Sequence, residues 1–240
     1  MLDELKSKYS ISGKVNFEKG YNDFNKAVLK HESGAEAEVY LYGGHITSWR
    51  TPEFTELLFL SKKAEFAQGK AIRGGMPVIF PQFGSGDLPA HGFARNDLWQ
   101  VKSTSVSDSG DVSISLILKE SQKSLSAWPF QFDLQIKVII GEDLTTVLTV
   151  RNSGQKQFSF QQALHTYFAV GDISKVLVTG LKGIAYTDKL NNNQTTNENN
   201  DLLYFKAALD RVYINTPDKI ELVDESLKRK FIISKQNMLD

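Results

Sequence analysis

Apolar and polar residues alternate in several short runs of this 240-residue sequence. In residues 112–119 (VSISLILK) an apolar side chain occupies every second position. A period of two places the apolar side chains on one face of a β-strand. Runs of the same kind occur at 133–140, 144–150, 158–164, 175–181, 210–214 and 229–234. Breaks rich in Gly, Asn and Asp at 43–44, 108–111, 141–143 and 152–154 predict hairpin turns between strands.

Helical patterns are scarce and short. Residues 3–9, 62–66 and 120–128 are the candidates, each for a turn or two. Repeated strands with short turns predict an all-β fold, an antiparallel β-sandwich. No strong linker divides the sequence, so we expect one domain over 1–240. The polar, low-complexity segment 191–200 (NNNQTTNENN) predicts a surface loop.

The composition excludes several classes of function. Lys+Arg and Asp+Glu both number 28, and this zero net charge argues against a general nucleic-acid binder. The absence of cysteine excludes disulfides, thiolate metal sites and cysteine nucleophiles. The N-terminus has no apolar core of signal-peptide length, and the best apolar run, 57–61, is too short to span a membrane. We therefore expect a cytoplasmic protein with no nucleic-acid or membrane partner.

The segment 70–84 (KAIRGGMPVIFPQFG) interrupts the strand pattern. Its two prolines, Pro77 and Pro81, disfavour a central strand. One interpretation is a loop that bridges two sheets, with Arg73 on the surface. The other is a backbone bent so that Arg73 faces a pocket. The spacing alone leaves both open.

A second irregular segment, 91–96 (HGFARN), places His91 and Arg95 on either side of Gly92. It is either a turn with a satisfied histidine and an exposed arginine, or a cationic corner. A cationic corner would hold a phosphate or a sugar hydroxyl, because guanidinium and imidazole groups donate strong hydrogen bonds.

A third segment, 161–168 (QQALHTYF), carries a polar stripe in which Gln161, Ala163 and His165 share one face. Unpaired polar groups are costly to bury, so the stripe either faces solvent or lines a concave pocket. His165 is a candidate for proton transfer because imidazole titrates near neutral pH. Asp210 opens the strand at 210–214 and is, by default, a turn cap. The four histidines show no metal-ligand spacing, and we expect neither a metal nor a nucleotide cofactor.

Residues 72–84 (IRGGMPVIFPQFG) and 88–99 (LPAHGFARNDLW) resemble the hexose-6-phosphate mutarotases, or glucose-6-phosphate 1-epimerases, of the aldose 1-epimerase superfamily. Residues 163–181 resemble the family's catalytic-histidine strand, and 207–217 its aspartate-bearing strand. The resemblance extends from about Lys26 to the end of the sequence. It implies the large, twisted antiparallel β-sandwich of galactose mutarotases, with the site in a cleft on one sheet.

The resemblance also implies roles for individual residues. His165 matches the general acid at the ring oxygen, and His91 the histidine that hydrogen-bonds the substrate. Arg73 and Arg95 match the family's cationic residues, and a phosphate favours such forked, permanently charged donors. Asp210 matches the acceptor for a sugar hydroxyl, and Gln82 is a plausible neighbour of the substrate. Anomer interconversion by acid–base ring opening requires no cofactor.

The family's general base, a glutamate beyond the strand that matches 231–235, has no counterpart in 1–240. The resemblance therefore implies a domain that is C-terminally incomplete relative to the family, and neither Glu221 nor Glu225 matches the glutamate motif. The leading hypothesis is a glucose-6-phosphate 1-epimerase, active or impaired in this form, that works as a monomer on a hexose 6-phosphate. The alternative is a non-catalytic carbohydrate or sugar-phosphate binding protein on the same fold. An epimerase for unphosphorylated aldoses is a third reading, which the two arginines disfavour.

Overall fold

The alternating runs form antiparallel strands in a computed structural model, which describes residues 1–53 and 55–238. The chain divides into two compact units, Met1–Ala169 (the first unit) and Val170–Asp240 (the second unit). The first unit contains α1 (Leu2–Tyr9), β1 (Val15–Lys19), β2 (Asn25–Lys30), β3 (Glu36–Tyr40), β4 (His45–Arg50), β5 (Val78–Ile79), β6 (Gln100–Val106), β7 (Val112–Lys119), α2 (Gln122–Ala127), β8 (Phe132–Ile140), β9 (Leu144–Asn152) and β10 (Ala163–Leu164). The second unit contains β11 (Val176–Thr179), β12 (Ala185–Asp188), β13 (Gln194–Asn197), β14 (Leu202–Tyr204), β15 (Arg211–Tyr213), β16 (Lys219–Asp224) and β17 (Arg229–Ser234). Single-turn 3₁₀ helices lie at Tyr21–Asp23, Ala94–Asn96 and Ile173–Lys175.

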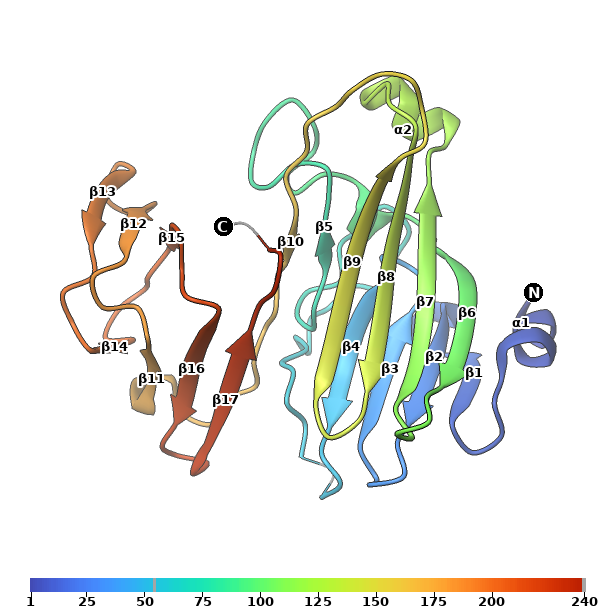
Figure 1. Ribbon diagram of the computed structural model, residues 1–240, viewed down its shortest axis with the longest axis horizontal. Helices are drawn as coiled ribbons and strands as arrows, with labels where there is room; N and C mark the ends of the chain where they lie inside the picture. Colours follow the sequence, from blue (N-terminus) through green and yellow to red (C-terminus); the bar gives the residue numbers. More distant parts are fainter. Residues whose placement is uncertain (54, 239–240) are drawn as a thin grey trace. The chain divides into compact units, whose positions relative to one another are not determined.

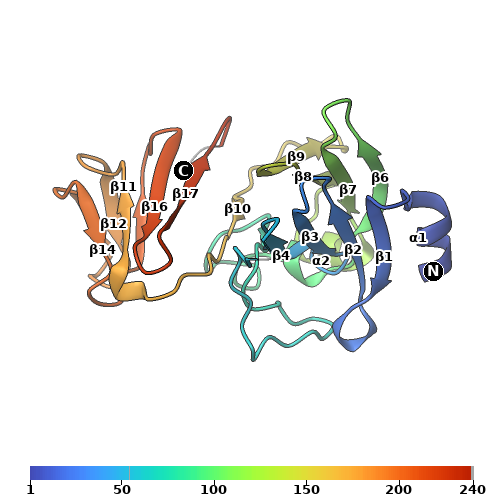
Figure 2. The ribbon, with the colours of Figure 1, turned by 90° about the horizontal axis from the view of Figure 1, so that it is seen from below.

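Two four-stranded antiparallel sheets face each other in the first unit (Figures 1 and 2). One has the order β1-β2-β3-β4 and the other β6-β7-β8-β9. Burial along β8 alternates without a break, so that Leu134, Ile136 and Val138 are fully buried. They share one hydrophobic core with Phe17 and Leu29 of the other sheet. Each buried side chain of this size stabilises the fold by roughly 1.5–3 kcal/mol, which is why the period-two pattern forms a sandwich.

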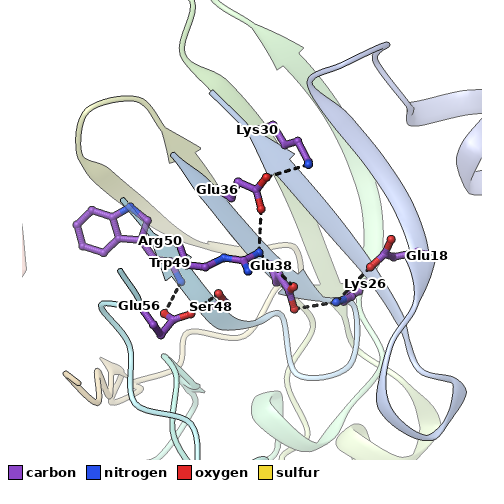
Figure 3. A network of polar contacts seen from close by, with 9 residues as sticks. All are labelled: Glu18, Lys26, Lys30, Glu36, Glu38, Ser48, Trp49, Arg50 and Glu56. Atoms are coloured by element: carbon purple, nitrogen blue, oxygen red, sulfur yellow. Dashed lines mark hydrogen bonds and ion pairs between the residues drawn. The ribbon is translucent and has the colours of Figure 1, made fainter. Parts of the chain in front are cut away.

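The opposite face of the β1–β4 sheet is polar (Figure 3). Lys26 Nζ lies 2.8 Å from Glu38 and 3.2 Å from Glu18. Arg50 Nη2 lies 2.8 Å from Glu36 Oε2. Opposite charges on neighbouring strands stabilise their pairing modestly. This sheet therefore has one face in the core and one face covered by ion pairs.

The second unit contains two smaller antiparallel sheets with the strand orders β14-β11-β16-β17 and β13-β12-β15. Asp224, at the end of β16, is fully buried. Its carboxylate accepts hydrogen bonds from the backbone N–H groups of Gly171 (3.0 Å) and Leu227 (3.2 Å). Such bonds compensate the desolvation of a buried carboxylate.

Most strands predicted from the alternation are confirmed, and three predictions are wrong. Residues 62–66 form no helix; Phe66 is buried against Tyr40 instead, and a helix this short has a costly nucleus. Residues 158–162 lie outside the strands, and only Ala163–Leu164 pairs regularly, with β5. The polar segment 191–200 contains a strand, β13, which is exposed along its whole length.

Candidate active site

Arg73 is followed by two glycines whose Cα atoms lie too close to neighbouring backbone for any side chain to fit. Gly74 and Gly75 both adopt positive φ angles, 103° and 63°. A Cβ on Gly74 would lie 2.3 Å from the carbonyl oxygen of Phe59, and one on Gly75 would lie 2.3 Å from that of Ile46. Only glycine tolerates this conformation and approach. Arg73 is therefore attached to a closely packed, bent turn, and its side chain is exposed, as in the interpretation that placed it on the surface.

The loop that follows β5 is held together by its own side chains. The Gln82 amide donates to the carbonyls of Gly84 (3.2 Å) and Leu88 (3.1 Å), and its Oε1 accepts from the Leu88 N–H (3.0 Å). Gln82 was predicted as a neighbour of the substrate. In the structure its polar atoms order the loop that carries His91.

His91 is bound to this loop at two points. Its backbone N–H donates to the carbonyl of Gly84 (2.8 Å), and the Gly84 N–H donates to His91 Nδ1 (3.2 Å). Because Nδ1 accepts a hydrogen bond, the neutral ring carries its proton on Nε2. His91 therefore presents an N–H donor from the ring nitrogen that the loop does not use.

His165 directly follows β10 and lies beside His91. The two ring centroids are 6.0 Å apart at an interplanar angle of 72°. The ring centroid of Tyr167, two residues further along the chain, lies 4.8 Å from that of His165. The backbone N–H of His165 donates to Pro77 (3.1 Å), which joins the histidine segment to the one that carries Arg73. Within the described residues, the buried His165 Nδ1 has no hydrogen-bond partner.

Arg95 completes a cationic cluster. It lies in the 3₁₀ helix Ala94–Asn96, and its Nη2 donates to the carbonyl of Ala90 (2.8 Å). Burial lowers the pKa of His91, and the charges of Arg95, His165 and Arg73 lower it further. Burial also lowers the pKa of Arg95, as does the charge of Arg73. The two guanidinium groups and the two imidazoles therefore act on one another.

This cluster is chemically suited to an anionic, hydroxyl-bearing small molecule. Two forked cations repel each other until an anion is bound between them. The His91 Nε2–H is a hydrogen-bond donor, and His165 supplies a second imidazole for proton transfer. Four predicted site residues, Arg73, His91, Arg95 and His165, are thus brought together in the first unit.

Asp210 lies in the second unit, immediately before β15, and is exposed. Its carbonyl accepts the Lys189 N–H (2.8 Å). The next residue, Arg211, donates to the buried Glu198 (2.9 Å). Burial alone would raise the pKa of Glu198, but hydrogen bonds from Asn200 and Tyr213 and the charge of Arg211 lower it. This buried ion pair was not predicted, because Glu198 lies in the polar, Asn-rich stretch.

In the first unit, two residues near the cluster were missed in the sequence analysis. Tyr167 could have been found, since it lies two positions after His165 on the same face of an alternating segment. His45, which is fully buried behind Gly74, gives no signal in the sequence beyond a histidine after a Gly-Gly turn.

The best-formed pocket of the described residues does not lie at this cluster. A pocket of about 400 Å³ lies elsewhere in the first unit, lined by Glu38, Thr47, Glu56 and Phe59 among others. Within residues 1–53 and 55–238, no group of three or more His, Cys, Asp or Glu side chains is arranged to bind a metal. In the same part of the chain, no helix has the length and apolar character needed to cross a membrane. The site is therefore defined by the chemistry of its side chains.

Comparisons with known proteins show which family this sequence belongs to. The aldose 1-epimerase family matches residues 25–239. A protein of Cenchrus ciliaris named "Putative glucose-6-phosphate 1-epimerase" is 39% identical over 224 residues, covering 90% of this chain and 68% of its own length. A protein of the same name from Escherichia coli is 38% identical over 222 residues, covering 91% of this chain and 73% of its own length.

Solved structures show the same architecture. The crystal structure of a "putative mutarotase (YeaD)" from Salmonella typhimurium superposes with a TM-score of 0.87 at 29% identity, covering all of this chain and 80% of that one. A galactose mutarotase related enzyme from Lactobacillus acidophilus shares the fold with a TM-score of 0.68 at 18% identity, covering 83% of this chain and 73% of its own.

The fold is thus that of a β-sandwich protein of the galactose mutarotase type, as predicted. The match over 25–239 identifies the particular family: this chain belongs to the aldose 1-epimerases.

Proposed function

We propose that this protein interconverts the α and β anomers of hexose 6-phosphates, as a glucose-6-phosphate 1-epimerase. The observation that carries the proposal is the meeting of His91 and His165 with Arg73 and Arg95 in one cluster. Imidazoles supply the proton transfer that anomer interconversion needs, and paired guanidinium groups supply the charge that a phosphate needs. The relatives named for glucose 6-phosphate, at 38–39% identity, support this substrate.

The proposed reaction is a proton exchange across the sugar ring. His165, as the imidazolium, donates a proton to the ring oxygen while the anomeric hydroxyl loses its own proton to a base. The C1–O5 bond then breaks and leaves an open-chain aldehyde. Rotation about C1–C2 presents the other face of the aldehyde, and the reverse proton transfers close the ring. No oxidant, metal or second substrate is required by this proton balance.

Each predicted site residue has a part in the proposal. Arg73 and Arg95 bind the phosphate, and the His91 Nε2–H donates to a sugar hydroxyl. Asp210 accepts from another hydroxyl. Gln82 acts beside them by ordering the loop that carries His91, which its three hydrogen bonds within that loop support.

The general base is the role to which the proposal assigns no residue. Glu221 lies in β16, and its Oε1 pairs with Lys230 Nζ (3.1 Å). Neither Glu221 nor Glu225 matches the family's glutamate motif. A positioned base accelerates the reaction roughly 100- to 10,000-fold. The turnover rate of residues 1–240 therefore measures how much of this acceleration the chain retains.

The proposal includes the domain organisation, the location and the oligomeric state. We propose that both units belong to one aldose 1-epimerase domain, which the family match across their boundary supports. Hexose 6-phosphates are charged metabolites that membranes retain inside cells, so the proposed substrate favours the cytoplasm. A monomer suffices, since the clustered site residues come from one chain.

A mutarotation assay tests the proposal. α-Glucose 6-phosphate is the substrate, and an anomer-specific dehydrogenase reports the β form against the spontaneous rate. An acceleration that depends on His165 supports the epimerase, after which Glu221 and Glu225 are replaced in turn. Sugar-phosphate binding with no acceleration supports the alternative, a binding protein on the same fold. Neither binding nor acceleration contradicts both.

A further inference from the structure

His45 is a buried histidine without a part in the proposed reaction. It begins β4, directly after the Gly43–Gly44 turn, and is fully shielded from solvent. Its Nε2 lies 2.8 Å from the carbonyl oxygen of Gly74. A carbonyl only accepts, so Nε2 carries the proton and donates. Among the described residues, His45 Nδ1 has no hydrogen-bond partner.

The contact of His45 is with the turn that carries Arg73. Gly74 follows Arg73 directly, and a Cβ on Gly75 would lie only 2.7 Å from His45 Nε2. The imidazole therefore packs against both glycines of the turn. Backbone bonds hold the same turn on its other side: the Ser61 N–H donates to the Arg73 carbonyl (3.0 Å), and the Gly75 N–H donates to Phe59 (2.7 Å).

The charge state of His45 also matters to the cluster. Burial lowers the pKa of His45 to about 4; the Gly74 hydrogen bond opposes this shift and the charge of Arg95 adds to it. The ring is therefore neutral at physiological pH. A protonated ring would add a third cation beside Arg73 and Arg95, which already act on each other.

We propose that His45 is a positioning residue for phosphate recognition: its neutral Nε2–H holds the Gly74 carbonyl and thereby fixes the point from which Arg73 reaches the anion. This inference rests on the proposed function, in which Arg73 and Arg95 bind the phosphate. It assigns His45 no contact with the sugar. The sugar portion of the substrate is therefore bound independently of His45.

Two amide substitutions separate the hydrogen bond from the packing. In His45→Gln the amide nitrogen can take the place of Nε2, and in His45→Asn it takes the place of Nδ1, out of reach of Gly74. Thr47→Val is the matched control, since Thr47 is also buried in β4 and its Oγ1 has no hydrogen-bond partner in the described part of the chain. Calorimetry measures the Kd of each variant for glucose 6-phosphate, inorganic phosphate and glucose.

We expect His45→Asn to raise the Kd for glucose 6-phosphate and for inorganic phosphate about tenfold, which corresponds to the loss of roughly one well-placed hydrogen bond. The Kd for glucose should not change. His45→Gln and Thr47→Val keep all three affinities within about twofold. Equal losses on glucose and on glucose 6-phosphate, or no loss in His45→Asn, would overturn the positioning role. If the unsubstituted protein itself binds neither phosphate compound, the proposed function fails first, and this result is distinct from any behaviour of the variants.

A second measurement does not depend on whether the variants fold. Nitrogen-15 NMR of the histidine side chains of the unsubstituted protein reports which ring nitrogen carries the proton. The inference requires the Nε2–H form of His45 at pH 6, without protonation at Nδ1. An Nδ1–H form or an imidazolium at that pH overturns it.

Discussion

The rings of His91 and His165 lie with their centroids 6.0 Å apart and nearly perpendicular, although they come from segments far apart in the sequence. His91 is held through Nδ1 by the Gly84 N–H, whereas His165 Nδ1 is buried without a hydrogen-bond partner among the described residues. The two imidazoles therefore differ in what they can do. His91 is fixed as a donor through Nε2, and His165 is held by ring packing against His91 and Tyr167.

Replacing His165 by Gln should separate catalysis from binding. We expect kcat for glucose 6-phosphate to fall roughly 100- to 10,000-fold, because the general-acid term is lost. The Kd from calorimetry should change only slightly, since the phosphate contacts remain. His31→Gln is the matched control, because His31 lies in the turn after β2 and its ring Nδ1 bonds to nearby Ser33. An unchanged kcat in His165→Gln would contradict the assignment.

Replacing Arg95 by Ala should selectively weaken binding of the phosphorylated sugar. Loss of charge-assisted hydrogen bonds to the phosphate should raise KM for glucose 6-phosphate about 10- to 100-fold. The KM for glucose should hardly change, and Arg95→Lys should fall between because it keeps the charge without the fork. Arg151→Ala, at a mostly exposed side chain in β9, serves as the control. Equal losses on both sugars would remove the phosphate role.

The stability of the protein should fall on acidification in a way that depends on His45. Its pKa is about 4 in the folded state and near 6.5 when unfolded, so the unfolded state binds a proton first as the pH falls. The loss begins near pH 6.5, is complete below about pH 4, and approaches about 3 kcal/mol. Over this pH range, the free energy of unfolding measured with urea should fall more steeply for the unsubstituted protein than for His45→Gln. Parallel curves would show that His45 titrates normally when folded.

A methyl group at Gly75 should be costly. Gly75→Ala combines a positive φ angle of 63° with a Cβ 2.3 Å from the carbonyl oxygen of Ile46. Gly13→Ala is the matched control, because Gly13 has a φ of 69° but no atom within 4 Å of the added Cβ. The left-handed conformation alone costs roughly 1–2 kcal/mol, which we expect for Gly13→Ala. Gly75→Ala should lose at least about twice that in urea unfolding, and equal losses would contradict the close approach.

The strands could be predicted where both the pattern and the pairing are regular. Burial in β8 follows the alternation at every position, because a period-two sequence buries one face of a regular strand. In β7 the apolar positions are buried as predicted, but Ser113 and Ser115 are buried as well. The segment 158–164 has the same pattern but mostly lies outside the strands, because its pairing partner is the irregular, proline-containing segment around β5. A local sequence pattern does not show how regular the backbone of its distant pairing partner is.

The same division applies to the candidate site. The sequence alone determined the all-β class and the residue types of the site, because alternation and motif spacing are local properties of the chain. Only the tertiary structure decided that His91 donates through Nε2, that Tyr167 packs on His165, and that buried His45 holds the Gly74 carbonyl. The contact between His45 and Gly74 joins residues distant in sequence, and burial at this contact lowers the pKa of His45. Burial and hydrogen bonding of this kind exist only in the folded chain, so the sequence alone does not show them.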